Sequence, residues 1–259
     1  MTVEQHDVLP VPRLSATMIV VREASGANGM EVMAIKRSQN LRVLPGFTVF
    51  PGGVMDEMDV YAAKALTESG IHLTPPTFEM LEAEFKGQVI SRDALYVSLF
   101  AAGARELLEE TGIYMGSGRV EKEQIASIRS ALLHGQGSEW IDLFQSESSW
   151  YPFRYVGRRV TPKQVKHRFD AHFFIVEVPQ DKVATPSPDE VETVIWSTPG
   201  ALLSGFQNDY FHMAPPTVDA LLTLDQHPSL EALMEKAIMP LQVNDDERIN
   251  RFLRQLSAN

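Results

Sequence analysis

The chain has 259 residues, of which 44% are hydrophobic and 22% charged, and its formal net charge is -11. These proportions are those of an ordinary globular protein with a sizeable core, and the acidic balance argues against nucleic acid as the main partner. The chain contains no cysteine, which excludes disulfides, thiolate metal sites and a cysteine nucleophile together.

The amino terminus carries no sign of export or membrane insertion. Residues 1–10 contain no continuous apolar run, so neither a signal peptide nor a membrane span is predicted there. We therefore expect a cytoplasmic protein that makes no contact with a membrane.

Several segments have the pattern of β-strands. Apolar, β-branched runs at Leu14–Arg22 and Glu31–Lys36 flank Ser25–Gly29, which predicts a hairpin. Further strands are predicted at Arg168–Val178 and Val191–Trp196, each bounded by proline or glycine. Together these segments predict a mixed sheet.

Helical periodicity is clearest from Asp93 to Thr111. Ser91 or Asp93 could cap the start of this helix, and Gly112 suits a left-handed C-cap. Four residues form its apolar stripe: Val97, Ala101, Ala104 and Leu108. Amphipathic helices are also predicted at Thr77–Phe85, Glu121–Leu133, Thr217–Leu224 and Asp245–Leu256. Helices on both sides of a mixed sheet predict an α/β sandwich.

The end of the central helix carries a cluster of carboxylates. Glu106, Glu109 and Glu110 are spaced i, i+3 and i+4, so they share one helix face. Such a cluster is most often a solvated face. Here the three like charges repel one another, and a hard cation such as Mg²⁺, which takes oxygen ligands, relieves that repulsion.

A glycine turn at Phe50-Pro51-Gly52-Gly53 follows an apolar segment upstream of that helix. Glycine permits a close approach of the backbone to a metal or a phosphate. Alone the turn is weak support for a site, but combined with the glutamate helix it favours one.

These two segments resemble the Nudix box. Arg105–Ile113 matches its second half, Arg-Glu-U-x-Glu-Glu-x-Gly-U with U a bulky aliphatic residue, and Gly52-Gly53 matches its first. Asp59 stands where the family has a glutamate, and the segment Val60–Ala104 is much longer than the family's spacer. The chain thus resembles the split-box branch that includes peroxisomal coenzyme A diphosphatases.

The resemblance implies a Nudix α/β/α sandwich with a mixed sheet, an insertion within the box and extra C-terminal helices. It implies a single domain over residues 1–259, with an inserted segment at about 60–92 and a helical extension at about 215–259. A homodimer is a further expectation, because dimers are common in the family.

The resemblance also implies roles for the residues of the box. Glu106, Glu109 and Glu110 would bind Mg²⁺, or alternatively Mn²⁺, together with the backbone carbonyl of Gly52 or Gly53, of which we favour Gly53. Arg105 would orient them, by pairing with Glu109 or with an acidic residue of the glycine loop. On a later loop, Glu190 or Glu192 is a candidate to activate water, and Glu190 is preferred.

Upstream of the turn, Arg42, Gly46 and Phe50 resemble the coenzyme A signature and are candidate substrate-binding residues. Arg42 could equally be a surface residue.

The predicted function is metal-dependent hydrolysis of a small-molecule diphosphate substrate, with coenzyme A or acyl coenzyme A preferred. The alternatives are ADP-ribose, dinucleotides or NADH as substrate, and a regulatory Nudix module that binds such ligands without cleaving them.

Overall fold

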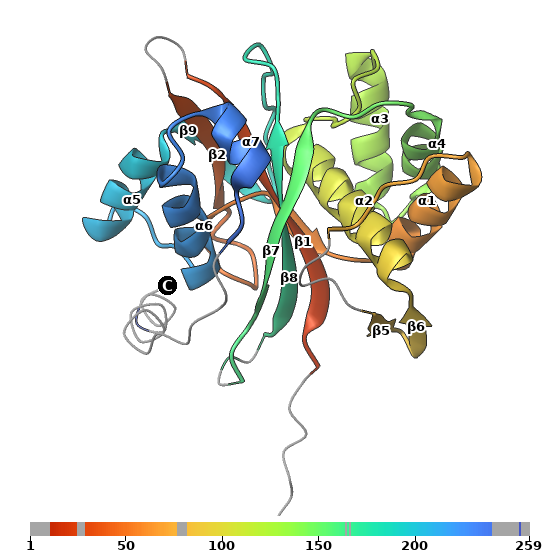
Figure 1. Ribbon diagram of the computed structural model, residues 1–259, viewed down its shortest axis with the longest axis horizontal. Helices are drawn as coiled ribbons and strands as arrows, with labels where there is room; N and C mark the ends of the chain where they lie inside the picture. Colours follow the sequence, from red (N-terminus) through yellow and green to blue (C-terminus); the bar gives the residue numbers. More distant parts are fainter. Residues whose placement is uncertain are drawn as a thin grey trace, which may run out of the picture.

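A mixed β-sheet forms the middle layer of the chain in the computed structural model, and helices cover both of its faces (Figure 1). The structure describes residues 11–24, 29–76, 82–163, 165, 167–239 and 254. The strands are β1 (Arg13–Glu23), β2 (Met30–Arg37), β3 (Thr48–Val49), β4 (Gly52–Val54), β5 (Ala83–Phe85), β6 (Gln88–Ile90), β7 (Phe153–Val160), β8 (Phe169–Glu177) and β9 (Val191–Ser197). The helices are α1 (Glu57–Glu68), α2 (Arg92–Thr111), α3 (Lys122–Leu133), α4 (Ser138–Ser146), α5 (Pro199–Gln207), α6 (Pro215–Asp225) and α7 (Leu230–Lys236).

Strand β1 is the centre of the sheet. The strand order is β3-β2-β1-β8-β7, with β4 also paired to β1 and β9 to β2. Only the β1–β8 pair of this sheet is parallel among the described strands. The predicted hairpin is confirmed as β1 and β2, and the two later predicted strands are confirmed as β8 and β9. Strand β7 escaped prediction because three arginines and a glycine interrupt its apolar pattern, and its register shifts at that glycine.

Two hydrophobic cores lie on the two faces of the sheet. Side chains alternate along a strand, so Met18 and Val20 of β1 join the core beneath α1, α2 and α4, whereas Ile19 and Val21 join the core beneath α5, α6 and α7. The predicted α/β/α sandwich is therefore confirmed. In the part of the chain that the structure describes, every helix is too short or too polar to span a lipid bilayer.

The central helix α2 forms as its sequence predicts. The hydroxyl of Ser91 accepts the Ala94 N–H, so Ser91 is the N-cap and Asp93 lies inside the first turn. At the other end, Gly112 has φ of 70° and its N–H donates to the Leu108 carbonyl. The helix that carries the glutamates is thus fixed at both ends by local chemistry.

One predicted helix is wrong in part, and another lies almost entirely outside the described residues. The helix predicted over Thr77–Phe85 is wrong at Ala83–Phe85, which pairs with β6 as strand β5, while residues 77–81 lie outside the described residues. β5 and β6 turn at Lys86-Gly87, both with positive φ, and this turn chemistry outweighs the weak helical pattern. The helix predicted at Asp245–Leu256 lies outside the described residues except for Arg254. The other two predicted helices are confirmed as α3 and α6.

Candidate functional site

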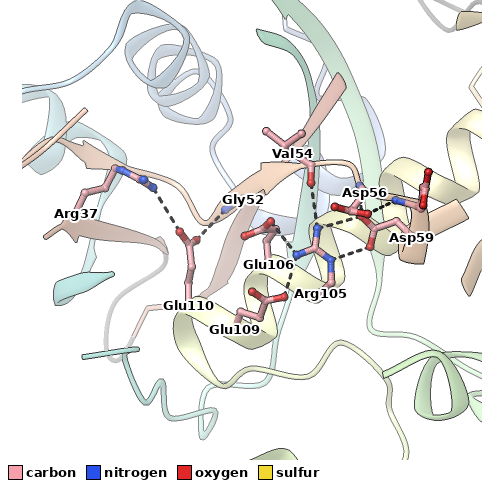
Figure 2. A network of polar contacts seen from close by, with 10 residues as sticks. Arg37, Gly52, Val54, Asp56, Asp59, Arg105, Glu106, Glu109 and Glu110 are labelled. Carbon is pink, nitrogen blue, oxygen red and sulfur yellow. Dashed lines mark hydrogen bonds and ion pairs between the residues drawn. The ribbon is translucent and has the colours of Figure 1, made fainter. Parts of the chain in front are cut away.

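The glycine turn lies directly against α2, although the two are far apart in sequence. Strand β4 pairs with β1 so that Gly52 faces Thr17 and Gly53 faces Ala16. The Gly52 N–H donates to Oε2 of Glu110 at 3.0 Å (Figure 2). The two halves of the split motif therefore meet in space.

Both positions require glycine, because neighbouring atoms leave no room for a Cβ atom. At Gly52, φ is 152° and an added Cβ would lie 2.2 Å from the Ala16 carbonyl oxygen. At Gly53, an added Cβ would lie 2.3 Å from Oε1 of Glu106. A larger residue at either position would displace the strand or the carboxylate.

Arg105 is the hub of the carboxylate cluster (Figure 2). Its Nε and Nη2 donate to the two carboxylate oxygens of Asp59 at 2.8 and 3.0 Å, and Nη2 also donates to the Val54 carbonyl at 3.0 Å. Its Nη1 donates to Oε1 of Glu106 and of Glu109, each at 2.9 Å. Of the two partners considered from the sequence, Glu109 is used, whereas the other acidic partner, Asp59, lies on helix α1 and not in the glycine loop.

Asp59 reaches Arg105 because it belongs to helix α1. Asp56 is the N-cap of this helix, and its N–H donates to Oδ2 of Asp59 at 2.8 Å in a capping box. The side chain of Asp59 is fully buried. Although burial alone disfavours the charged guanidinium, the carboxylates of Glu106, Asp59 and Glu109 raise the pKa of Arg105 well above its usual value.

The glutamates of α2 have strongly perturbed acidities. Burial raises the pKa of Glu106 to about 7, against the opposing effect of Arg105. Burial, and next the charge of Glu106, raise the pKa of Glu110 well above its usual value. The pKa of Glu109 is also raised by burial, with Arg105 opposing. Such shifts are typical of functional sites.

Glu190 joins this cluster and Glu192 does not. Burial, and then the charge of Glu106, raise the pKa of Glu190. Its loop docks on the end of α2, where the Ser187 N–H donates to the Glu110 carbonyl at 2.9 Å. Glu192 instead pairs with Lys36 at 2.8 Å on the surface. The geometry favours Glu190, as the sequence preference did.

The carboxylates of this cluster are suitable ligands for a divalent metal ion, although they are not already arranged around one. In the described part of the chain, no three acidic or histidine side chains are arranged to hold a metal ion. Five carboxylates nevertheless surround two guanidinium groups: Asp59, Glu106, Glu109, Glu110 and Glu190 around Arg37 and Arg105. Carboxylate oxygens are the ligands of Mg²⁺, and a further positive charge would offset the acidic excess, which adds to the effect of burial on these pKa values.

A cavity of about 610 Å³ opens beside the glycine turn. It runs between the sheet, the loop after β2 and the start of α6. Arg42 and Phe50 line it, as do Gly52 and Gly53. Gly46 does not line it: its φ is 69°, and an added Cβ would lie 2.3 Å from the Gln39 side chain, so Gly46 shapes the loop.

Four arginines line the cavity. Two of them are paired with a carboxylate, and two are not paired with any described residue. Arg37 pairs with Glu110 at 3.5 Å, and Arg159 pairs with Asp219 at 3.4 Å. Arg13 and Arg42 form no side-chain hydrogen bond or ion pair with any described residue. Arg13 and Arg159 were missed in the sequence because nothing nearby marks them as binding residues.

Arg129 of α3 is a second residue that the sequence did not reveal. Its Nε and Nη2 donate to the backbone carbonyl of Glu109 at 3.2 and 2.9 Å. This carbonyl belongs to the last turn of α2, where no intrahelical donor is available. Arg129 therefore fixes the backbone from which Glu109 projects.

Replacing Arg129 with glutamine is expected to weaken Mn²⁺ binding about 10-fold, because partners that orient a ligand have effects of this size. Isothermal titration of the metal-free protein with Mn²⁺ alone measures this. Arg119→Gln is the control, since the Arg119 side chain is 90% exposed and pairs with Glu121 on the surface. Reduced stability with unchanged Mn²⁺ affinity would show that Arg129 supports only the fold.

The chain is similar to proteins of known structure. A family model described as the NUDT19 Nudix domain matches residues 13–224. A crystal structure of a Nudix hydrolase from Alicyclobacillus acidocaldarius aligns with a TM-score of 0.70 at 24% identity, covering 89% of this chain and 98% of that one. The Nudix domain of Shewanella oneidensis NrtR, complexed with ADP-ribose, aligns with a TM-score of 0.40 at 11% identity, covering 75% of this chain and 78% of that one. The first of these structures shares the three-layer fold described above.

Proposed function

Because the chain belongs to the Nudix hydrolase family and is a pyrophosphohydrolase, we propose that it cleaves the diphosphate linkage of coenzyme A or an acyl coenzyme A. One observation carries the proposal. The buried carboxylate of Glu110 is bonded to the glycine turn, and that turn opens on a cavity lined by Arg42, a cation that pairs with no described side chain.

In this proposal the glutamates of α2 form the catalytic centre. Glu106, Glu109 and Glu110, together with the Gly53 carbonyl, are the residues that would hold Mg²⁺ or Mn²⁺. When bound, such an ion neutralises phosphate charge and lowers the pKa of an attacking water. Glu190 would accept a proton from an attacking water, a role that suits a carboxyl whose pKa burial raises above its usual value.

Arg105 and the glycine turn have supporting roles. Arg105 is buried, and its five contacts keep Glu106 and Glu109 on one side of the helix. Gly52 and Gly53 allow the backbone of β4 to approach the carboxylates without a side chain between them. The site thereby receives a diphosphate next to the metal-binding residues.

The substrate preference rests on Arg42 and the shape of the cavity. A guanidinium group recognises phosphate through paired hydrogen bonds, and the apolar wall that includes Phe50 suits the rest of a nucleotide. ADP-ribose, dinucleotides and NADH carry the same diphosphate and are the alternative substrates. A module that binds without cleaving is the other alternative, and the retained glutamates disfavour it.

Product analysis tests this function. The protein is incubated with Mg²⁺ and a pool of coenzyme A, acetyl coenzyme A, ADP-ribose, NADH and diadenosine polyphosphates, and products are identified by mass spectrometry. We expect 3′,5′-ADP and a phosphopantetheine product. We also expect Arg42→Ala to lower kcat/KM for coenzyme A more than for ADP-ribose. Cleavage of another pool member would reject the coenzyme A preference, and no cleavage at all would favour the binding module.

A further inference from the structure

A second arginine without an acidic partner, Arg13, lines the cavity. Arg13 is the first residue of β1, four residues before Thr17, which pairs with Gly52. At about 3.3 Å per residue, the backbone of Arg13 lies about 13 Å along the strand from that pair. Arg13 and Gly52 nevertheless line the same cavity. The cavity therefore reaches from the glycine turn to the start of β1, where Arg13 lines it.

The Arg13 side chain is held in place but its charge is not neutralised. Its guanidinium carbon lies 5.0 Å from the centre of the Phe169 ring, and Phe169 is its register partner on β8. Stacking on a ring face orients a guanidinium group and leaves its N–H edge available. No carboxylate or other polar group of the described residues binds this side chain.

The charges around the cavity point to two anion sites rather than one. Arg37 and Arg159 each pair with a carboxylate, so they add little net charge. Arg42 and Arg13 are the lining arginines left without an acidic partner in the part of the chain that the structure describes. The proposed function already uses Arg42 as a contact to the substrate, but it leaves Arg13 unexplained.

We propose that Arg13, stacked on Phe169, binds a second phosphate of the substrate, one carried by the nucleotide half away from the diphosphate that is cleaved. This inference rests on the proposed function and extends it. The cavity would then select ribose-phosphorylated nucleotides, such as coenzyme A with its 3′-phosphate, over nucleotides that carry only the diphosphate. A guanidinium group matches a phosphate in both geometry and charge.

The test compares coenzyme A with 3′-dephospho-coenzyme A, which differ by one phosphate and share the diphosphate. In the wild type we expect the ratio of kcat/KM values to favour coenzyme A. In Arg13→Gln this ratio should fall roughly 10- to 100-fold, the size expected for a hydrogen bond between charged groups. Arg119→Gln, a change to an exposed arginine outside the cavity, should leave the ratio as in the wild type.

A binding experiment separates this inference from the proposed function. Calorimetry measures the affinities of wild type and Arg13→Gln for 3′,5′-ADP and for 5′-AMP, and it requires no turnover. Selective loss of 3′,5′-ADP affinity in the variant supports the inference even if coenzyme A is not cleaved. Equal loss for both ligands, or no loss for either, overturns it, because Arg13 would then only pack on Phe169.

Discussion

Glu110→Gln is expected to lower metal-dependent hydrolysis roughly 10³-fold, the range seen when a charge-stabilising group is removed from an active site. Glu110 is the most buried glutamate of the cluster, with a side chain that is 4% exposed, and its Oε2 accepts the Gly52 N–H. A glutamine amide cannot supply the negative charge that a divalent cation requires. Turnover measured with saturating Mg²⁺ should therefore collapse.

The same substitution should leave the fold in place. Burial raises the pKa of Glu110 well above its usual value, which means that burial disfavours the charged form, and an amide has nearly the shape of the carboxyl without its charge. The amide oxygen can still accept the Gly52 N–H. Thermal unfolding followed by circular dichroism should change little, and Glu68→Gln, on the exposed surface of α1, is the matched control. Wild-type turnover in Glu110→Gln would refute the assignment of the site.

The parts of the structure that the sequence predicted are those set by local chemistry. Helix α2 has a periodic stripe, a serine N-cap and a glycine C-cap, and it forms as expected. The hairpin of β1 and β2 follows from two apolar runs that flank a short polar sequence containing two glycines. The glutamates at i, i+3 and i+4 were placed correctly on one helix face, because helix geometry alone determines their relation.

The parts that were missed depend on contacts distant in sequence. Helix α1 packs against α2, from which the strands β5 and β6 separate it along the chain. The partnership of Asp59 with Arg105 joins residues 46 positions apart. Arg129 can bond to α2 only because α3 packs against the end of that helix. Arg13 can bind a ligand only because the start of β1 lines the cavity. Neither position has a local pattern that marks it.

The limits of the inserted segment and of the C-terminal extension, the homodimer and the cytoplasmic location stay predictions. The roles of individual site residues also stay proposals. The experiments on Glu110, Arg42, Arg129 and Arg13 address those roles separately, since each reads out a different step of binding or catalysis.

Arg105→Met is expected to lower the free energy of unfolding by about 3–5 kcal/mol at neutral pH, the usual cost of removing one partner of a buried ion pair. Methionine fills a similar volume but leaves Asp59, which is fully buried, without its bidentate partner. The Val54 carbonyl loses a donor as well. Urea unfolding at pH 7 measures the loss.

A matched surface pair provides the control for Arg105→Met. Lys64 and Glu68 are exposed on α1 and lie 3.8 Å apart. Exposed pairs at this helical spacing contribute about 0.3–0.5 kcal/mol, so Lys64→Met should have a small effect. A comparable loss from both substitutions would mean that the buried pair has no special importance.

The pH dependence of this loss identifies its cause. Burial already raises the pKa of Asp59, and Arg105 opposes that rise, so the variant should raise the pKa further. A carboxyl whose pKa is higher in the folded state than in the unfolded state destabilises the fold at a pH where it would otherwise ionise. This destabilisation is absent below about pH 4, where the carboxyl is protonated in both states, and it grows as the pH rises towards the folded pKa. The difference from the wild type should therefore shrink towards about pH 4.

Adding Asp59→Asn to Arg105→Met should restore part of the lost stability at pH 7, because the amide carries no charge and can still accept the Asp56 N–H. A loss that is independent of pH and is not relieved in the double variant would assign the effect to packing around residue 105. A loss that follows pH and is relieved would show that Arg105 keeps a buried carboxylate charged, and thereby joins α1 to the helix that carries the catalytic glutamates.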